Sequence, residues 1–376
     1  MTSPITNCYD PNAVRPRLPV ERVFLYRPER EWTYSHHPSI TFYKGRYHAI
    51  WSNGRVNEDD PGQRVLIVSS ADWSHWTEPA PLVGPLQGDH SELVQTAAGF
   101  HQHGETLIAY FGQYEYSAEA IRNGIENAVG HQGTSLWAMT TSDGSTWSTV
   151  REMCMPIVPN HGPQKIASGR LIISGHTSFP YSVDPSGLSG WRMTGLYPPD
   201  MPLAIYAESD RLRDMQARMS WPAGLCEGSF YETDDGVIHM LLRLTGRNHA
   251  GKLWLTESHD DETTWSAPVE TDFSDNDTKF HVGRLPDGRF YYVGCPDPEP
   301  RGARNPLVLS LSVDGVRFDR HFILADQDYV QKRTGRYKGG LYGYPHTMIH
   351  DGHLHVIVSL RKEAVAVLRV ALSALT

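Results

Sequence analysis

Histidine, tyrosine and arginine recur in this chain at positions where they could move protons or bind an anion. Two adjacent histidines, His36 and His37, stand in the stretch YSHHPSITFYKG, and other histidines stand in NHGPQ, DTKFH and YGYPHT. Histidine and tyrosine can act as general acids and bases, and arginine can bind a carboxylate through two parallel hydrogen bonds. The chain has 19 histidines and most must have structural roles, so the candidates depend on which residues the fold brings together.

A hairpin repeat indicates that fold. Each copy has a strand pattern rich in β-branched and aromatic residues, a turn that ends in glycine, and a second apolar strand pattern, as in SITFYKGRYHAIWS. Glycine suits these turns because it adopts positive φ without strain. Six copies are present, and their turn glycines are Gly45, Gly104, Gly169, Gly236, Gly288 and Gly352.

A second repeat follows four of these hairpins. A hydroxyl residue, an aspartate two positions later and an aromatic residue further on recur in Ser70–Trp76, Thr141–Trp147, Ser258–Trp265 and Ser312–Phe318. The aspartate and hydroxyl groups can accept hydrogen bonds from the N–H groups of the turn itself. Together the two repeats predict an all-β fold, a β-propeller with four-stranded blades, six by repeat count. A β-sandwich with similar turns is the alternative.

The repeats predict one propeller domain that spans residues 1–376. The C-terminal stretch AVAVLRVALSAL is expected to pair with the N-terminal stretch VERVFLYRP and so to close the ring of blades. Residues 196–222 match no repeat and are interpreted as an insertion between blades, with a short helix over residues 207–219. A seventh, degenerate blade could lie in that insertion or near the N-terminus.

Charge and composition narrow the range of partners. The net charge is −9 and no block of five or more like charges occurs, which argues against nucleic acid and against an anionic membrane surface. No apolar run is long enough to span a membrane and the N-terminus lacks a secretory signal pattern, so we expect a cytoplasmic protein. The four cysteines show no CxxC spacing and fit reduced thiols. The sequence does not indicate the oligomeric state.

Propeller geometry collects the candidate residues at one face, where each first strand starts and each second strand returns. Adjacent strand residues face opposite ways, so only one of His36 and His37 is expected to face the channel. First-strand starts contribute His36, His37, His161, Gln164, Glu227, Lys279, His281, Tyr344 and His346, with Tyr342 nearby. Second-strand ends contribute Asn53, Tyr114 and Arg243, a loop adds Arg304 and Asn305, and Lys338 is a further candidate. A basic pocket in an acidic protein indicates an anionic substrate such as a carboxylated sugar, and we expect an acidic oligosaccharide or polysaccharide.

These hairpins and aspartate turns resemble those of the sialidase-like Asp-box β-propeller family. The segments YSHHPSI, PNHGPQ, DTKFHVGRLPDGRFYYVG, RNPLVLSLSVDG and YGYPH are similar to those of propeller-type ulvan lyases. They are also similar to segments of the lyases and hydrolases that cleave L-rhamnose from α-1,4-linked D-glucuronate. The resemblance covers about residues 30–372. Because these relatives have seven blades, it implies seven here.

The resemblance also implies roles for individual residues. In those lyases histidine and tyrosine handle the proton, and arginine or histidine neutralises the uronate carboxylate. The residues that match these roles by position are His37 and His161, Tyr114 or Tyr344, and Arg243, and His346 is added as a catalytic candidate. The other residues at this face are assigned to substrate binding. Sialidases themselves use three arginines, a tyrosine–glutamate nucleophile pair and an aspartate acid, and they carry an early Arg-Ile-Pro motif that this chain lacks.

β-Elimination next to a uronate carboxylate is the predicted reaction, at an L-rhamnose-α-1,4-D-glucuronate or similar linkage. Arg243 would stabilise the developing enolate, and a tyrosine or histidine would move the proton. Hydrolysis between two carboxyl groups is the first alternative, although Glu92 and Glu227 lie in different blades with no sign of pairing. A non-catalytic propeller that binds carbohydrate is the second alternative.

The sequence predicts no cofactor, and no spacing matches a standard metal motif. A divalent cation bound in the axial channel is an alternative, because His161, Cys226 and His281 are all expected near the axis.

Overall fold

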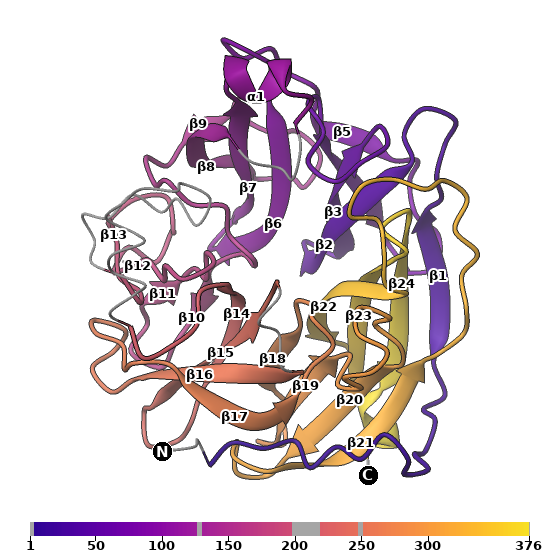
Figure 1. The fold of residues 1–376 in the computed structure, drawn as a ribbon, viewed down its shortest axis with the longest axis vertical. Helices are drawn as coiled ribbons and strands as arrows, with labels where there is room; N and C mark the ends of the chain where they lie inside the picture. The colour runs from indigo at the N-terminus through magenta and orange to yellow at the C-terminus, as the bar shows by residue number, and fades with distance from the viewer. Residues whose placement is uncertain (1–3, 126–129, 198–218, 247–250, 376) are drawn as a thin grey trace.

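Six antiparallel sheets of four strands surround a central axis and form a β-propeller (Figure 1). This computed structural model describes residues 4–125, 130–197, 219–246 and 251–375. The predicted all-β propeller with four-stranded blades is confirmed, and so is the count of six blades. The seven blades implied by the resemblance are wrong, because six sheets use every strand in the described part of the chain.

Each of the first five blades is built from four consecutive strands. Blade 1 contains β2 (Tyr34–Tyr43), β3 (Arg46–Gly54), β4 (Arg64–Ser70) and β5 (Ala80–Val83). Blade 2 contains β6 (Val94–His103), β7 (Thr106–Tyr116), β8 (His131–Thr141) and β9 (Arg151–Glu152). Blade 3 contains β10 (Gln164–Lys165), β11 (Leu171–Ile172), β12 (Tyr181–Ser182) and β13 (Trp191–Arg192). Blade 4 contains β14 (Leu225–Glu232), β15 (Ile238–Leu244), β16 (Lys252–Ser258) and β17 (Val269–Ser274). Blade 5 contains β18 (His281–Arg284), β19 (Phe290–Gly294), β20 (Leu307–Ser312) and β21 (Phe318–Ala325).

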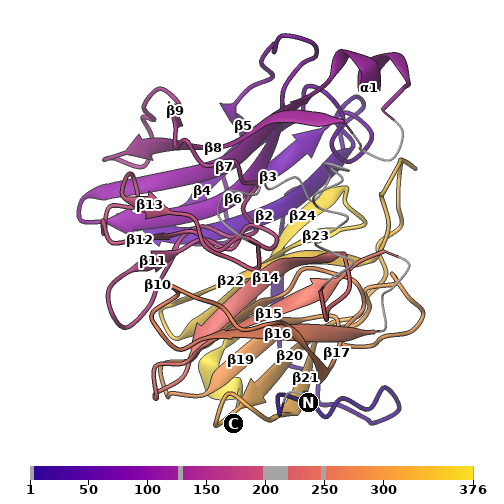
Figure 2. The ribbon, with the colours of Figure 1, turned by 60° about the vertical axis from the view of Figure 1, so that its left-hand side comes forward.

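Blade 6 joins strands from both ends of the chain. Its inner strands are β22 (Tyr342–His350), β23 (His353–Leu360) and β24 (Ala364–Ala371), and its outer strand is β1 (Glu21–Tyr26). β1 pairs antiparallel to β24, with Glu21 opposite Arg369. The segment before β1 runs past blades 4 and 5, where Thr6 bridges to Asp272 and Arg317 (Figure 2).

The turn glycines of the hairpin repeat have the backbone conformation that the sequence predicted. All six have positive φ, between 53° at Gly104 and 93° at Gly288. A Cβ atom added at Gly45 would meet no neighbour within 4 Å, so backbone conformation and not space explains glycine there.

The aspartate turns connect the third and fourth strands of the blades. In the turn of blade 2, one carboxylate oxygen of Asp143 accepts the N–H groups of Ser145 and Thr146, each at 2.7 Å. The Thr141 hydroxyl accepts the N–H of Gly144 at 2.9 Å. Equivalent bonds form in blades 1, 4 and 5 around Asp72, Asp260 and Asp314.

Blade 3 holds a fifth aspartate turn that the sequence reading missed. Asp184 accepts the N–H of Ser186 at 2.9 Å, and the Trp191 indole N–H donates to the Gly187 carbonyl at 2.9 Å. This copy departs from the predicted pattern because Asp184 and Trp191 are seven positions apart, compared with four or five in the other copies. Blade 6 has no such turn, because its third and outer strands come from opposite ends of the chain.

Helical structure is minor in the described residues. It consists of α1 (Ala118–Arg122) and one 3₁₀ turn, Leu372–Ala374. Most of the proposed insertion 196–222, and the helix expected over 207–219, falls on residues 198–218 and so lies outside the described residues. No helix in the described ranges is long and apolar enough to cross a membrane.

The hydrophobic cores lie between neighbouring blades. One core packs Val293 and Leu309 of blade 5 against Leu354, Val356 and Leu368 of blade 6. Another packs residues of blades 1 and 2 together, with Trp147 against it. Because these inter-blade cores bury the apolar side chains, the inner strands can carry polar residues at the axis and at one face.

We predict that Trp147→Ala destabilises the protein by about 3 kcal/mol, because it removes an aromatic side chain that packs on the core between blades 1 and 2. Denaturant unfolding measures this loss. Ser145→Ala in the same turn is the control, since Ser145 is exposed and its bond to Asp143 uses the backbone N–H. It should change stability by no more than about 0.5 kcal/mol. Equal effects of the two variants would contradict a structural role for the aspartate turn.

Candidate functional site

A cavity of about 500 Å³ lies where first strands begin and second strands end. This size suits a small saccharide unit. Six of the residues predicted from the sequence line it: His37, Tyr114, Glu227, Arg243, Arg304 and Tyr344. They come from blades 1, 2, 4 and 6 and from the loop between β19 and β20, so only the closed ring brings them together.

A tyrosine, a glutamate and an arginine form the centre of this cavity. The Tyr344 hydroxyl donates a short hydrogen bond to one carboxylate oxygen of Glu227. The other carboxylate oxygen lies 2.7 Å from Arg243 Nε. Arg243 also donates from Nη1 to the backbone carbonyl of Asp277 at 2.9 Å. Its guanidinium is therefore largely occupied by protein groups.

Three first strands have the same distortion where they enter the cavity. Irregular register occurs between His36 and Ser39 in β2, between Cys226 and Ser229 in β14, and between Gly343 and His346 in β22. His37, Glu227 and Tyr344 lie inside these bulges with φ of 54°, 51° and 55°. Residues other than glycine rarely adopt positive φ. A β-bulge also changes the direction in which a side chain points. The bulges explain how all three side chains reach the cavity.

The protonation states follow from burial and charge. Burial acts to raise the pKa of Glu227, but the charge of Arg243 and the Tyr344 hydroxyl hold that pKa below its usual value. Burial raises the pKa of Tyr344 well above its usual value, although Arg243 acts in the opposite direction. The resting pair is therefore a neutral phenol that donates to a carboxylate, and Glu227 can accept the phenol proton when Tyr344 reacts.

Four cationic side chains surround the Tyr344 ring. The ring centroid lies 4.9 Å from Lys279 Nζ, and 5.7 to 5.9 Å from the charged groups of Arg243, Arg304 and Lys362. Arg304 donates from Nη2 to the Asp277 carbonyl at 2.8 Å. Its Nε and Nη1 are buried and have no hydrogen-bond partner. Unpaired buried guanidinium donors are costly, so these two nitrogens are open to a hydrogen-bond acceptor such as an anion.

Among the cavity residues that the sequence did not predict, Asp59 carries the most perturbed carboxyl group. It lies in the loop between β3 and β4 and lines the cavity together with Tyr114 and Glu227. Burial and the neighbouring Glu58 raise the pKa of Asp59 to about 7, although the Tyr114 hydroxyl bonds to it. An acid with this pKa can donate a proton near neutral pH. The acidic stretch VNEDDPG, which directly follows a second strand, was the signal for it.

Several predicted residues lie behind the cavity wall. His36 is fully buried, bonds to Ser359 through Nδ1 at 2.7 Å, and packs against Tyr344 in a tilted arrangement with ring centroids 3.9 Å apart. Asn53 donates to the Tyr34 carbonyl at 2.9 Å. Of the two adjacent histidines, only His37 lines the cavity.

Other predicted residues also stand outside the cavity lining. Lys338 forms a buried ion pair with Glu363 at 2.9 Å, and the Tyr342 hydroxyl donates to the Gln327 carbonyl at 2.9 Å. Glu92, considered as a hydrolytic carboxylate, pairs with Arg55 at 2.7 Å and is partly exposed. The residues predicted for the site that do not line the cavity are His36, Asn53, His161, Gln164, Lys279, His281, Asn305, Lys338, Tyr342 and His346.

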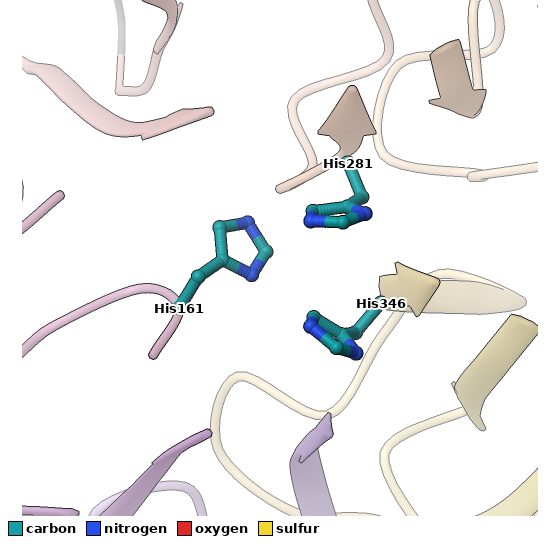
Figure 3. Close-up of side chains that lie close together, drawn as sticks. All are labelled: His161, His281 and His346. Atoms are coloured by element: carbon teal, nitrogen blue, oxygen red, sulfur yellow. The ribbon is translucent and has the colours of Figure 1, made fainter. Parts of the chain in front are cut away.

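Three of these residues, His161, His281 and His346, form a separate group at the propeller axis (Figure 3). Gln164 lies beside them, with its Nε2 3.3 Å from His281 Nε2. Burial lowers the pKa of His161 and of His346 well below the usual value, and that of His281 to about 3. All three are neutral imidazoles at neutral pH. Cys226, which the sequence placed with them, lines the cavity instead.

Comparison with solved structures shows where this fold recurs. A structure described as a sialidase has 19% identity and a TM-score of 0.65, over 95% of this chain and 33% of its own. A protein of unknown function from Dyadobacter fermentans has 16% identity and a TM-score of 0.62, over 93% of this chain and 99% of its own. Trypanosoma rangeli sialidase in complex with sialic acid has 14% identity and a TM-score of 0.63, over 96% of this chain and 60% of its own. These likenesses show a shared fold.

This chain spans about a third of the length of the first of these structures. Curated proteins gave no match. A family match covers residues 45–356, which include most of the repeats described above. The protein therefore belongs to the family described as BNR repeat-like domain.

Proposed function

We propose that this protein is a glycoside hydrolase that acts on a sugar bearing a carboxylate. Tyr344 is the nucleophile, Glu227 is the base that takes its proton, and Asp59 is the acid that protonates the leaving oxygen. The observation that carries the proposal is the hydrogen bond from the Tyr344 hydroxyl to the buried Glu227 carboxylate at the cavity. Most glycosidases use two carboxyl groups, and sialidases are an exception with a tyrosine nucleophile.

Charge gives a physical reason for a tyrosine nucleophile. A carboxylate on the sugar would repel a carboxylate that attacks the neighbouring anomeric carbon. A neutral phenol approaches without this repulsion and becomes nucleophilic as its proton moves to Glu227. The Tyr344 oxygen then bonds to the anomeric carbon while the leaving oxygen takes the proton of Asp59. Water attacks in a second step with the roles reversed, so the anomeric configuration is retained.

The carboxylate of the substrate is assigned to Arg304. Its unpaired Nη1 can donate a charge-assisted hydrogen bond to a carboxylate oxygen, and its unpaired Nε is a second donor on the other edge of the guanidinium. Arg243, the clamp predicted from the sequence, is instead assigned to Glu227, which it keeps ionised. The fold shared with a sialidase solved in complex with sialic acid, itself a carboxylated sugar, supports this substrate class.

Elimination on a uronate, including an L-rhamnose-α-1,4-D-glucuronate, is the second candidate function. The observation in its favour is His37, whose ring lies edge-on to Tyr344 with centroids 5.0 Å apart. Burial lowers the pKa of His37 well below its usual value, so it is a neutral base beside the phenol. A histidine, a tyrosine and an arginine together could abstract a proton next to a carboxylate.

Product analysis separates these reactions. We expect the protein to release a saturated sugar with retained configuration from a panel of 4-nitrophenyl glycosides of carboxylated sugars, followed by NMR. Tyr344→Phe should lower kcat/KM at least about 1000-fold without a matching loss of thermal stability. An unsaturated uronate, seen by its ultraviolet absorbance on rhamnosyl-glucuronate, would favour elimination. Saturable binding with no product from any substrate would favour a binding propeller.

The pKa of Asp59 predicts a pH dependence. Because the acid must be protonated and its pKa is about 7, kcat/KM should fall as pH rises through about 7. Asp59→Asn should abolish this decline. It should also slow hydrolysis of an alkyl glycoside about 100-fold or more, but slow a 4-nitrophenyl glycoside far less, since nitrophenolate leaves without a proton. Glu92→Gln should keep the decline, because Glu92 is partly exposed and lies outside the cavity lining. A decline that persists in Asp59→Asn would remove Asp59 as the acid.

The Arg243–Glu227 pair predicts a pH-dependent loss of stability. Arg243→Gln leaves a buried carboxylate without its counter-charge and should cost about 3–5 kcal/mol near pH 7. In the parent, the lowered pKa of Glu227 stabilises the fold above the unfolded pKa, and this contribution is lost as pH falls. In Arg243→Gln, burial raises the pKa of Glu227. Protonation of Glu227 at lower pH therefore removes the buried charge and restores part of the lost stability.

The difference between parent and variant should therefore shrink between pH 7 and about pH 4, as measured by denaturant unfolding. Arg284→Gln is the control, because Arg284 pairs with the exposed Asp234 at the surface. That change should cost about 1 kcal/mol or less. A pH-independent difference for Arg243→Gln would mean that Glu227 is not the group it stabilises.

A further inference from the structure

Three histidines from three blades converge on the propeller axis, outside the cavity. His161 precedes β10 in blade 3, His281 begins β18 in blade 5, and His346 lies in β22 of blade 6. One ring nitrogen of each lies within 4.8 Å of the other two. Figure 3 shows the three rings turned toward a common space.

Hydrogen bonds fix the tautomer of His161. Its Nε2 lies 3.2 Å from the backbone carbonyl oxygen of Phe280, which can only accept. Nε2 therefore carries the proton and Nδ1 carries the lone pair. This Nδ1 is buried and has no hydrogen-bond partner. An imidazole whose N–H is held by a backbone carbonyl, with its other nitrogen free, has the usual arrangement of a metal ligand.

In each of the other two rings the lone pair lies on a nitrogen that already accepts a hydrogen bond. His281 Nε2 lies 3.3 Å from the Gln164 amide nitrogen, which donates to it, and His281 Nδ1 lies 2.6 Å from the Thr347 hydroxyl. The Ile40 N–H donates to His346 Nδ1 at 3.3 Å. Both bonds to the lone pairs are long, so a cation can compete for these nitrogens.

We propose that His161, His281 and His346 bind one divalent transition-metal ion of the zinc class at the propeller axis. The donor set determines the class of ion. Three imidazole nitrogens without a carboxylate suit zinc, cobalt, nickel or copper, whereas calcium and magnesium require oxygen ligands. Three protein ligands leave a position for water, as in other zinc sites with an open position.

Lys279 strengthens this selection. Its positive charge acts on all three histidines and opposes any cation among them. Ions held mainly by charge are therefore disfavoured, and ions that form strong bonds to imidazole remain. The Lys279 ammonium donates to the carbonyl of Asn160, which precedes His161 and lines the cavity. A metal on His161 thus clamps blades 3, 5 and 6 and steadies one wall of the cavity, whichever reaction the cavity performs.

Metal binding can be measured directly on the parent protein. Protein without a polyhistidine tag is treated with a chelator, dialysed and titrated with zinc and with cobalt. We expect one ion per chain by calorimetry, and a visible cobalt spectrum typical of nitrogen ligands. At a zinc concentration 100 times Kd, the thermal midpoint should rise by about 5 °C. Absence of stoichiometric binding to the folded parent would overturn the proposal.

Variants locate the site. His161→Gln and His346→Gln should each weaken zinc binding at least about 100-fold, while far-ultraviolet circular dichroism confirms that they fold. His355→Gln is the matched control, because His355 is also buried, both of its ring nitrogens lack partners, and it lies outside the group. It should bind zinc like the parent. Parent-like binding by both cluster variants would overturn the proposal.

X-ray absorption of the zinc-loaded parent gives a test that needs no variant. A shell of imidazole nitrogens is expected. Sulfur scattering would assign the ion to a cysteine, such as the cavity residue Cys226, and would overturn the proposal.

Discussion

A carboxylate buried between a guanidinium and a phenol is the interaction on which the site depends. Glu227 cannot stay ionised inside the protein without compensation, and Arg243 and Tyr344 supply it from two directions. Arg243 is on the strand next to Glu227, but Tyr344 comes from blade 6, which blade 5 separates from blade 4 along the chain. The hydrogen bond between Tyr344 and Glu227 therefore forms only when blades 4 and 6 are both folded, which makes the site depend on tertiary structure.

The β-bulges in β2, β14 and β22 allow regular blades to direct polar side chains into the cavity. A continuous pleat would send alternate side chains of a first strand into the two neighbouring inter-blade cores. At His37, Glu227 and Tyr344 the extra residue interrupts this alternation and points a polar side chain along the axis. Positive φ at these residues costs local backbone energy, and the pairing and packing on either side hold them in place. Evolution of a new reaction on this scaffold could change these three positions and leave the blades intact.

The fold could be predicted from the sequence because its signals are local. Glycines such as Gly45 and turns such as Thr141–Trp147 specify hairpins through a few adjacent residues, and counting them gave six blades. The fifth aspartate turn escaped because the segment from Asp184 to Trp191 is longer than in the other copies. Hairpin turns and aspartate turns do not depend on tertiary contacts. A pattern that allows a longer segment after the aspartate would therefore include the fifth turn.

The site could be predicted only in outline. Strand starts and ends identified Glu227, Arg243 and Tyr344 as residues of one face, but their hydrogen bonds join blades that are distant in sequence. The apparent lack of paired carboxylates favoured elimination, because Asp59 sits in a loop and its pKa depends on burial that no local pattern encodes. The unpaired N–H groups of Arg304 could not be predicted either, because they are defined by the positions of all the neighbouring groups in the fold.

Closure of the ring by β1 and β24 sets the order in which the molecule can be completed. Blades 1 to 5 each consist of strands close in sequence and can form while later residues are still on the ribosome. Blade 6 cannot, because its outer strand is made first and waits for residues 364–371. During that interval β1 has an unpaired edge. Blade 6 is therefore complete only once β24 has formed, and until then β1 has no partner strand.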